Sequence, residues 1–234
     1  MLAYARPLAE TLIALRSGRE DLQEHIKAVC GRVDEIEGQL QALVPEAGRL
    51  DRLLSEGAAL QEMFPDLDSR PPLYGVLVGV KDIFHVDGLI TRGGTALSSE
   101  LFAGAEAASV AALRRAGALV LGKTVTTEFA YMEPGPTGNP HNLAHTPGGS
   151  SSGSAAGVGC GMLAGGTASQ VIGSTIRPAG YCGAYGYKPS VGGINRGGSE
   201  VCYRGCVPGT IATQFQCEYQ RSRLSSLSPL QLKL

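Results

Sequence analysis

Apolar side chains recur at steps of three and four residues through the first third of the chain. One stripe comprises Leu22, Ile26, Val29, Val33, Ile36, Leu40 and Leu43. A second comprises Leu50, Leu53, Leu54, Leu60 and Met63. This period is typical of amphipathic helices, so residues 1–68 are predicted to form a helical segment that packs on a larger body. A coiled coil is the alternative, but the clean heptads are too few to favour it.

The pattern changes at Ser69-Arg70-Pro71-Pro72, because the two prolines cannot continue a helix. Val76–Val80 is a continuous apolar run of strand length, and Leu119–Leu121 is a second one. Between them, Ala105–Ala116 has an Ala/Leu/Val face and is followed by Gly117, which predicts a helix. Strand, helix and strand at this spacing indicate an α/β fold with a parallel sheet.

Glycine is over-represented in the rest of the chain. Most of the 33 glycines lie between Gly75 and Gly209, which predicts tight turns and close backbone approaches. Residues 139–152 are predicted to be a loop, and residues 154–164, with many small side chains, the helix that follows it. Periodicity is lost toward the C-terminus. The expected organisation is an N-terminal helical segment at 1–68, an α/β core at 69–198 and a divergent, poorly ordered tail at 199–234.

Charge and cysteine content exclude several classes of function. The formal net charge is −1 and no basic run is present, which argues against a general nucleic-acid binder. No apolar run reaches the roughly 18 residues of a membrane-spanning helix, and the N-terminus lacks a signal-peptide core. The six cysteines are scattered, and Cys202 and Cys206 have no second Cys/His pair nearby. We therefore expect a cytoplasmic protein with reduced thiols, no metal site and no membrane partner.

Two serines and one lysine are the candidates for chemistry. Ser150 and Ser174 lie 24 positions apart (174 − 150) in Gly/Ser-rich stretches, and Lys81 follows the apolar run that ends at Val80. A serine nucleophile needs a base, and none of the four histidines accompanies a G-x-S-x-G elbow. A lysine can be that base when it is neutral, which requires desolvation or a cationic neighbour. The alternative is a surface lysine that pairs with Asp82.

The Gly-rich loop that precedes the predicted helix at 154–164 has competing interpretations. Such loops can bind phosphate at a helix N-terminus, but the Gly-Lys-Ser/Thr of a P-loop is absent at the required spacing. No G-x-G-x-x-G pattern with a following acidic residue supports a dinucleotide site. A flexible linker does not fit the buried helix pattern beside it. The interpretation that remains is that the loop forms a nest of backbone N–H groups, which would stabilise an oxyanion during acyl transfer.

Four ordered motifs carry a family resemblance. They are the lysine strand at 73–82, the segment from Gly122-Lys123-Thr124 to Glu128-Phe129-Ala130, the serine loop at 148–153, and the stretches at 181–183 and 186–190. Together they resemble the amidase signature family, serine hydrolases that use a Ser–Ser–Lys triad and that include glutamyl-tRNA amidotransferase A subunits. The resemblance implies an α/β fold with a mixed, mostly parallel sheet flanked by helices, preceded here by the N-terminal helical segment.

The same resemblance implies residue roles. Ser174 would attack an amide carbonyl, Lys81 would be the general base, and Ser150, in a cis peptide conformation, would relay the proton between them. The backbone N–H groups of Val171, Ile172, Gly173 and Ser174 would form the oxyanion hole, and Ser151 would support the network. Arg177 is expected to tie the nucleophile loop to a carboxylate, with a substrate contact as the alternative. Neither a cofactor nor a metal is implied.

The sequence departs from the family in two ways. Many members have Asp-Thr-Gly-Gly-Ser or Gln-Thr-Gly-Gly-Ser where this chain has Gln170-Val171-Ile172-Gly173-Ser174. Members are also much longer, so we expect a truncated or frame-shifted chain with an incomplete sheet and an open edge. The expected partners are a small amide substrate and a second copy or a complementing chain. An inactive amidase fragment and a phosphate-binding module are the alternative functions.

Overall fold

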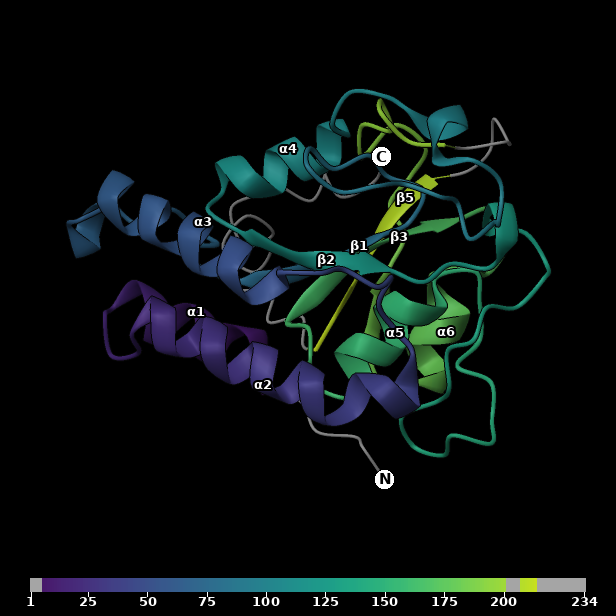
Figure 1. The fold of residues 1–234 in the computed structure, drawn as a ribbon, viewed down its shortest axis with the longest axis horizontal. Coiled ribbons are helices and arrows are strands. Elements are labelled where there is room, and N and C mark those ends of the chain that lie inside the picture. The colour runs from purple at the N-terminus through teal and green to yellow at the C-terminus, as the bar shows by residue number, and fades with distance from the viewer. Residues whose placement is uncertain (1–5, 201–206, 214–234) are drawn as a thin grey trace, which may run out of the picture.

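The fold is a five-stranded sheet with helices on both faces (Figure 1). The structure, a computed structural model, describes residues 6–200 and 207–213. The strands are β1 Leu77–Lys81, β2 Leu119–Thr124, β3 Gly165–Gln170, β4 Tyr185–Tyr187 and β5 Val207–Ala212, in the spatial order β2-β1-β3-β5-β4. β1 runs parallel to β2 and β3, whereas β5 is antiparallel to both of its neighbours. The predicted mixed α/β sheet flanked by helices is therefore confirmed.

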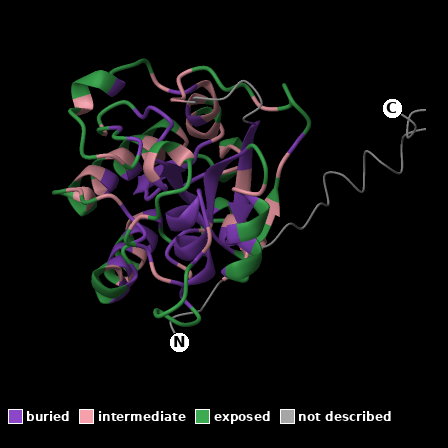
Figure 2. Cartoon of the chain, turned by 90° about the vertical axis from the view of Figure 1, so that its right-hand side faces the viewer, coloured by how far each residue is buried: buried purple, intermediate pink, exposed green. Residues whose placement is uncertain are grey.

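Three helices precede the sheet and three more follow its first strand. They are α1 Leu8–Arg16, α2 Leu22–Leu40, α3 Arg49–Met63, α4 Ala108–Arg115, α5 Ser152–Gly159 and α6 Ile176–Tyr181, with short 3-10 turns at Leu67–Ser69, Ser99–Phe102 and Glu128–Ala130. In Figure 1, α4 lies on one face of the sheet and α5 with α6 on the other. All eight residues of α5 are buried, and Figure 2 shows the buried segments gathered at the centre of the fold.

The helical pair predicted from the two apolar stripes corresponds to α2 and α3. The Asp21 side chain accepts hydrogen bonds from the N–H groups of Gln23 and Glu24, which starts α2, and Gln41 in a left-handed conformation (φ 53°) ends it. The stripe of α2 is buried against α3 and the sheet. Gly57 of α3 lies where a Cβ atom would come within 2.6 Å of Ile26, so glycine permits the close approach of the two helices.

The β2 edge of the sheet is covered by the segment that carries α3. The guanidinium of Arg52 donates hydrogen bonds to the carbonyl oxygens of Val120 (3.0 Å) and Leu121 (3.2 Å). The N–H of Val44 donates to the carbonyl of Lys123 at 2.8 Å. These donors satisfy carbonyl groups that would otherwise be unpaired at a strand edge. The opposite edge, β4, carries the exposed side chains of Tyr185 and Tyr187.

The expectation of an unpatterned tail from residue 199 is wrong for residues 207–212. This segment forms β5, which pairs with β3 over six residues from Gly165↔Ala212 to Gln170↔Val207. Its sequence, Val-Pro-Gly-Thr-Ile-Ala, has no period-2 pattern because five of its six residues are buried between two neighbouring strands. The rest of the expected tail, at 201–206 and 214–234, lies outside the described residues.

The close packing of α5 predicts the effect of a single methyl group. A Cβ atom at Gly153 would overlap the carbonyl oxygen of Ala42 and the backbone nitrogen of Val125, neither of which can move aside. We expect Gly153→Ala to lower the free energy of unfolding by about 2 kcal/mol or more, measured by urea denaturation. Gly31→Ala is the matched control: Gly31 is a helical glycine of α2 with open space around it, so this substitution should stabilise by about 0.5–1 kcal/mol. Equal effects at the two sites would contradict this account of α5.

His25 of α2 predicts a pH dependence of stability. Burial lowers the pKa of His25 below its ordinary value, against the opposing effect of Glu20, whose carboxylate is 2.8 Å from the His25 Nδ1. Protonation of His25 is thus harder in the folded than in the unfolded chain, and stability should fall as the pH drops below about 6.5. In thermal melts from pH 7.5 to 5.5, His25→Gln should show a smaller fall than the wild type. Replacement of the exposed His145 should leave the wild-type fall unchanged.

Candidate active site

The side chain of Lys81 lies at the centre of the candidate site. Lys81 is the last residue of β1 and is fully buried. Its Nζ is 2.7 Å from Ser150 Oγ, 3.0 Å from Ser151 Oγ and 2.8 Å from Ser169 Oγ. Its backbone N–H donates to Thr167 Oγ1 at 2.9 Å. The structure therefore brings together the lysine and the first serine that the sequence indicated, and surrounds the amine with hydroxyl groups.

The serine loop holds Ser150 and Ser151 directly before α5. The Gly149–Ser150 peptide bond is cis. The carbonyl of Ser150 accepts a hydrogen bond from the N–H of Thr127 at 3.1 Å. Gly148 has a φ of 76°, in the left-handed region, and its backbone passes close to Pro178, so this position favours glycine. These contacts fix the loop from both sides, and with it the direction of the Ser150 hydroxyl.

Ser174 lies on the loop between β3 and α6 and is half-buried. The N–H of Ser151 donates to the carbonyl of Ser174 at 3.3 Å, so the two serine-bearing loops are in direct contact. The Gln170 side chain closes the second loop, because its Oε1 accepts hydrogen bonds from the N–H groups of Thr175 (2.9 Å) and Ile176 (3.0 Å).

Arg177 links the two loops from the first turn of α6. Its Nη2 donates to the carbonyl oxygen of Gly149 at 2.7 Å. The sequence predicted a structural arginine that binds a carboxylate; the acceptor found here is a backbone carbonyl instead. Arg177 thus connects the loop that carries Ser174 to the serine loop, a contact that the sequence did not predict.

The four residues of the expected oxyanion hole form the turn that precedes α6. Within the described part of the chain, no acceptor takes a hydrogen bond from the N–H groups of Val171, Ile172, Gly173 or Ser174. None of the four has a positive φ. The turn is therefore made without a left-handed residue, which explains how branched side chains stand where many family sequences have threonine and glycine. Four neighbouring donors without an internal acceptor are suited to an anionic oxygen.

A cavity of about 460 Å³ opens beside the two loops. Its lining includes the three serines Ser150, Ser169 and Ser174. The rest of the lining is Ile83, Phe129, Ala130, Tyr131, Met132, Val171, Ile172, Gly173, Arg177 and Glu200. The nucleophile candidate and the expected oxyanion donors thus face one space that can hold a small molecule.

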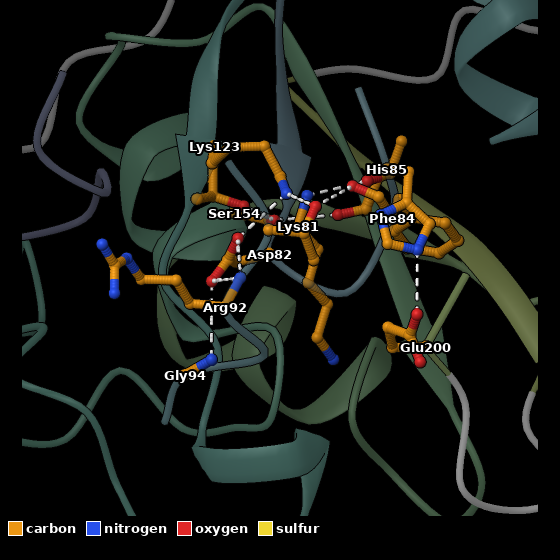
Figure 3. A network of polar contacts seen from close by, with 12 residues as sticks. Lys81, Asp82, Phe84, His85, Arg92, Gly94, Lys123, Ser154 and Glu200 are labelled. Atoms are coloured by element: carbon orange, nitrogen blue, oxygen red, sulfur yellow. Dashed lines mark hydrogen bonds and ion pairs between the residues drawn. The ribbon is translucent and has the colours of Figure 1, made fainter. Parts of the chain in front are cut away.

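Asp82 does not pair with Lys81, so the alternative of a surface lysine is wrong. Successive side chains of a strand point to opposite faces, and Figure 3 shows the Lys81 and Lys123 amines pointing away from each other. Asp82 Oδ1 lies 2.9 Å from Lys123 Nζ, and both side chains are almost fully buried. The Asp82 carboxylate also accepts from the N–H groups of Arg92 and Gly94, and Lys123 Nζ donates to Thr91 Oγ1 at 2.6 Å.

Sequence reasoning missed three polar residues that this arrangement uses. Ser169 and Thr167 alternate along β3, so both face Lys81; a Thr-x-Ser pair in a predicted strand could have indicated them. β3 was not predicted, because Gly-Gly-Thr-Ala-Ser-Gln lacks the apolar residues typical of strands. Lys123 was noted only as part of a motif. Its role depends on the parallel register Val80↔Lys123, which places it on the face of Asp82.

The phosphate-binding alternative for the Gly-rich loop is not supported by the start of α5. The N–H of Ser151 donates to the carbonyl of Ser174, and the N–H of Gly153 donates to the carbonyl of Val125. These amides already have acceptors, and the lysine nearest to them is directed at serine hydroxyls. An anion at this helix N-terminus would have to replace internal hydrogen bonds.

Cysteine is an unsuitable nucleophile among the described residues. Cys30, Cys160 and Cys182 are free and buried. Burial raises the pKa of Cys160 to about 11 and that of Cys182 to about 12, so both thiols are protonated at neutral pH. No cluster of three His, Cys, Asp or Glu side chains that could hold a metal occurs in the described ranges. No helix there is long and apolar enough to cross a membrane.

Comparison with known proteins agrees with this geometry. The model of the Amidase family matches residues 24–213. The chain is 35% identical over 201 residues to the A subunit of the glutamyl-tRNA(Gln) amidotransferase of Oleidesulfovibrio alaskensis, covering 83% of this chain and 40% of that protein. It is 32% identical over 219 residues to fatty-acid amide hydrolase 2-A of Danio rerio, and the match covers 88% of this chain and 41% of that protein.

The solved structures give the same result. The native peptide amidase of Stenotrophomonas maltophilia superimposes with a TM-score of 0.81 at 27% identity, over 92% of this chain and 46% of the enzyme. Another amidase superimposes with a TM-score of 0.78 at 30% identity, over 89% of this chain and 49% of that amidase. The chain belongs to the amidase signature family. It spans about two fifths of the length of the curated relatives.

The buried ion pair of Asp82 and Lys123 predicts a large effect on stability. Burial lowers the pKa of Lys123, and the Asp82 carboxylate opposes this. Lys123→Met would leave the Asp82 carboxylate buried without its cation, so the free energy of unfolding should fall by about 3–5 kcal/mol. Lys27→Met removes an exposed pair with Glu24 and should leave the free energy of unfolding nearly unchanged, because solvent screens this pair. Denaturant titrations measure the free energy of unfolding of both variants. Similar losses in the two variants would contradict a particular contribution of the buried pair to stability.

Proposed function

We propose that this chain carries the acyl-transfer site of an amide hydrolase, with Ser174 as nucleophile, Ser150 as proton relay and Lys81 as general base. The observation that carries the proposal is the buried Lys81 amine, 2.7 Å from Ser150 Oγ, beside a loop that presents Ser174 to a cavity. Membership of the amidase family supports the reaction class.

The first half of the reaction forms an ester on Ser174. Ser174 Oγ attacks the amide carbon while its proton passes to Ser150 Oγ, and the Ser150 proton passes to neutral Lys81 Nζ. The C=O bond opens to a tetrahedral oxyanion. When it collapses, the C–N bond breaks and the nitrogen takes a proton from Ser150, which recovers one from Lys81. The amine or ammonia then leaves.

The oxyanion is stabilised by the turn at 171–174. The N–H groups of Val171, Ile172, Gly173 and Ser174 are the candidate donors, since none is used within the described chain. Donors fixed before the reaction cost no reorganisation when the negative charge develops. Ser151 and Ser169 hold the Lys81 amine in place, and Arg177 holds the two loops together.

In the second half, water takes the place of the nucleophile. Its oxygen attacks the ester carbon, and one proton passes through Ser150 to Lys81. Collapse breaks the C–O bond to Ser174, and the proton returns to Ser174 Oγ. The products are a carboxylic acid and the free enzyme, so atoms and charges balance without a cofactor.

The names of the relatives indicate the range of substrates. The amidotransferase relative is named as one part of an assembly, whereas fatty-acid amide hydrolase and peptide amidase are named for their own amide substrates. We infer that a carboxamide is the substrate and that a complementing chain is the partner. The partner is inferred from the exposure of residues in the cavity lining, such as Ile172, which a second chain could cover.

An inactive, binding-only protein is the second candidate. The observation that favours it is again the exposure of the site, since Ile172 is 93% exposed and Met132 is 74% exposed. Stabilisation of an oxyanion by N–H donors is stronger when bulk water is excluded from the site. Reactivity of Ser174 decides between the two candidates.

A fluorophosphonate serine probe tests the proposal. The wild-type chain should be labelled at Ser174, identified by peptide mass spectrometry, and Ser174→Ala should abolish the labelling. Lys81→Met should slow labelling by about 10²–10⁴-fold, because the base is removed. Ser190→Ala, which changes an exposed serine outside the cavity, is the matched control and should label at the wild-type rate.

Circular dichroism of each variant separates a lost reaction from a lost fold. Labelling at a serine other than Ser174 would overturn the assignment of the nucleophile. Failure of the folded wild-type chain to react would favour the binding-only alternative.

A further inference from the structure

Part of the lining of the cavity beside Ser174 is apolar, and we call this part the apolar wall. Ile83, Phe129, Met132 and Ile172 contribute to it, and all four are branched, aromatic or long side chains. The backbone of Phe129 is held in place, because its N–H donates to the carbonyl of Gly93 at 2.8 Å. A wall of this composition is suited to the hydrocarbon part of a ligand.

Glu200 places a carboxylate in this apolar lining. Its N–H donates to the carbonyl of Ile83 at 2.7 Å, which anchors its backbone beside the end of β1. One carboxylate oxygen, Oε1, lies 2.9 Å from His85 Nε2, as Figure 3 shows. His85 is itself held, since its N–H donates to the carbonyl of Gly198 and its ring packs against Gly104. The carboxylate is thus positioned by the fold rather than extended into solvent.

The position of Glu200 leaves it able to bind a ligand. A carboxylate has acceptor sites on both oxygens, and the described contacts use one of them. The Glu200 side chain is 41% exposed, so it is accessible as well as anchored. Among the described residues, Glu200 is the one acidic residue of the cavity lining, and the one basic residue of that lining, Arg177, donates to Gly149 on the serine loop.

We propose that Glu200 is a specificity-determining residue that selects amide substrates with a protonated amine, joined to the carboxamide by an apolar spacer. The apolar wall would contact the spacer, and the Glu200 carboxylate would accept a charge-assisted hydrogen bond from the ammonium group. This inference rests on the proposed function for the position of the carboxamide at Ser174, and it adds the class of substrate.

Two amides of the same shape test the inference. In 5-aminopentanamide, an ammonium group stands where hexanamide has a methyl group. Binding to the Ser174→Ala chain, measured by calorimetry, requires no catalysis. We expect 5-aminopentanamide to bind about 5- to 10-fold more tightly than hexanamide, as a partly exposed ion pair allows. Glu200→Gln in the same background should remove the difference, and Glu200→Lys should reverse it.

Glu133→Gln is the matched control. It removes the same charge one residue beyond Met132, outside the cavity lining, so the preference for the cationic amide should persist. An equal loss of preference in Glu133→Gln would mean that overall charge, not the Glu200 contact, attracts the amine. If the Ser174→Ala chain with Glu200 intact binds hexanamide as tightly as 5-aminopentanamide, the inference is overturned, whatever the Glu200 variants show.

Ammonia release by the chain with intact Ser174 separates the two proposals. Hydrolysis of both amides with no preference in binding would leave the proposed function standing and refute the role of Glu200. Preferential binding of the cationic amide without hydrolysis would support the role of Glu200 and count against catalysis. When both amides are hydrolysed, kcat/KM should favour 5-aminopentanamide by the same factor as binding.

Discussion

A fully buried lysine amine imposes the main constraint on this structure. An amine removed from water is strongly unfavourable unless polar groups surround it. Here the hydroxyls of Ser150, Ser151 and Ser169 do so, from a loop and from a neighbouring strand. The parallel pairing of β1 with β3 and the close packing of α5 bring these hydroxyls to one point. The same arrangement that makes the buried amine tolerable also makes it a candidate base.

The opposite face of the sheet carries a second buried lysine with a different task. Lys123 is paired with the Asp82 carboxylate, which also accepts hydrogen bonds from the backbone at Arg92 and Gly94. The neighbouring Gly93 accepts from Phe129, a residue of the cavity wall. Stability and cavity shape are therefore coupled through Lys81, the last residue of β1, and Asp82, which follows it. Lys81 contacts the serine hydroxyls, whereas Asp82 binds the backbone at Arg92 and Gly94, beside the Gly93 carbonyl that holds Phe129.

Family membership and geometry indicate the class of reaction, but they do not identify the substrate. The nucleophile loop, serine loop and lysine strand lie within residues 24–213, the part matched by the family. Glu200 and β5 come from a stretch in which the sequence showed no pattern, yet both reach the site or the sheet beside it. The proposed substrate selection rests on Glu200, which none of the sequence motifs indicated, because a single anchored carboxylate leaves no periodic signal.

The sequence by itself determined the parts of the protein that depend on local order. The apolar stripes predicted α2 and α3, and the apolar runs predicted β1 and β2. The ordered motifs indicated Lys81 and Ser150, whose Nζ and Oγ atoms lie 2.7 Å apart, and Ser174 on the adjacent loop. Only the tertiary structure decided that β3 and β5 are strands, that Ser169 faces the lysine and that Asp82 pairs with Lys123. These features follow from strand register and burial between neighbours, which small and polar residues accept without leaving a hydrophobic period in the chain.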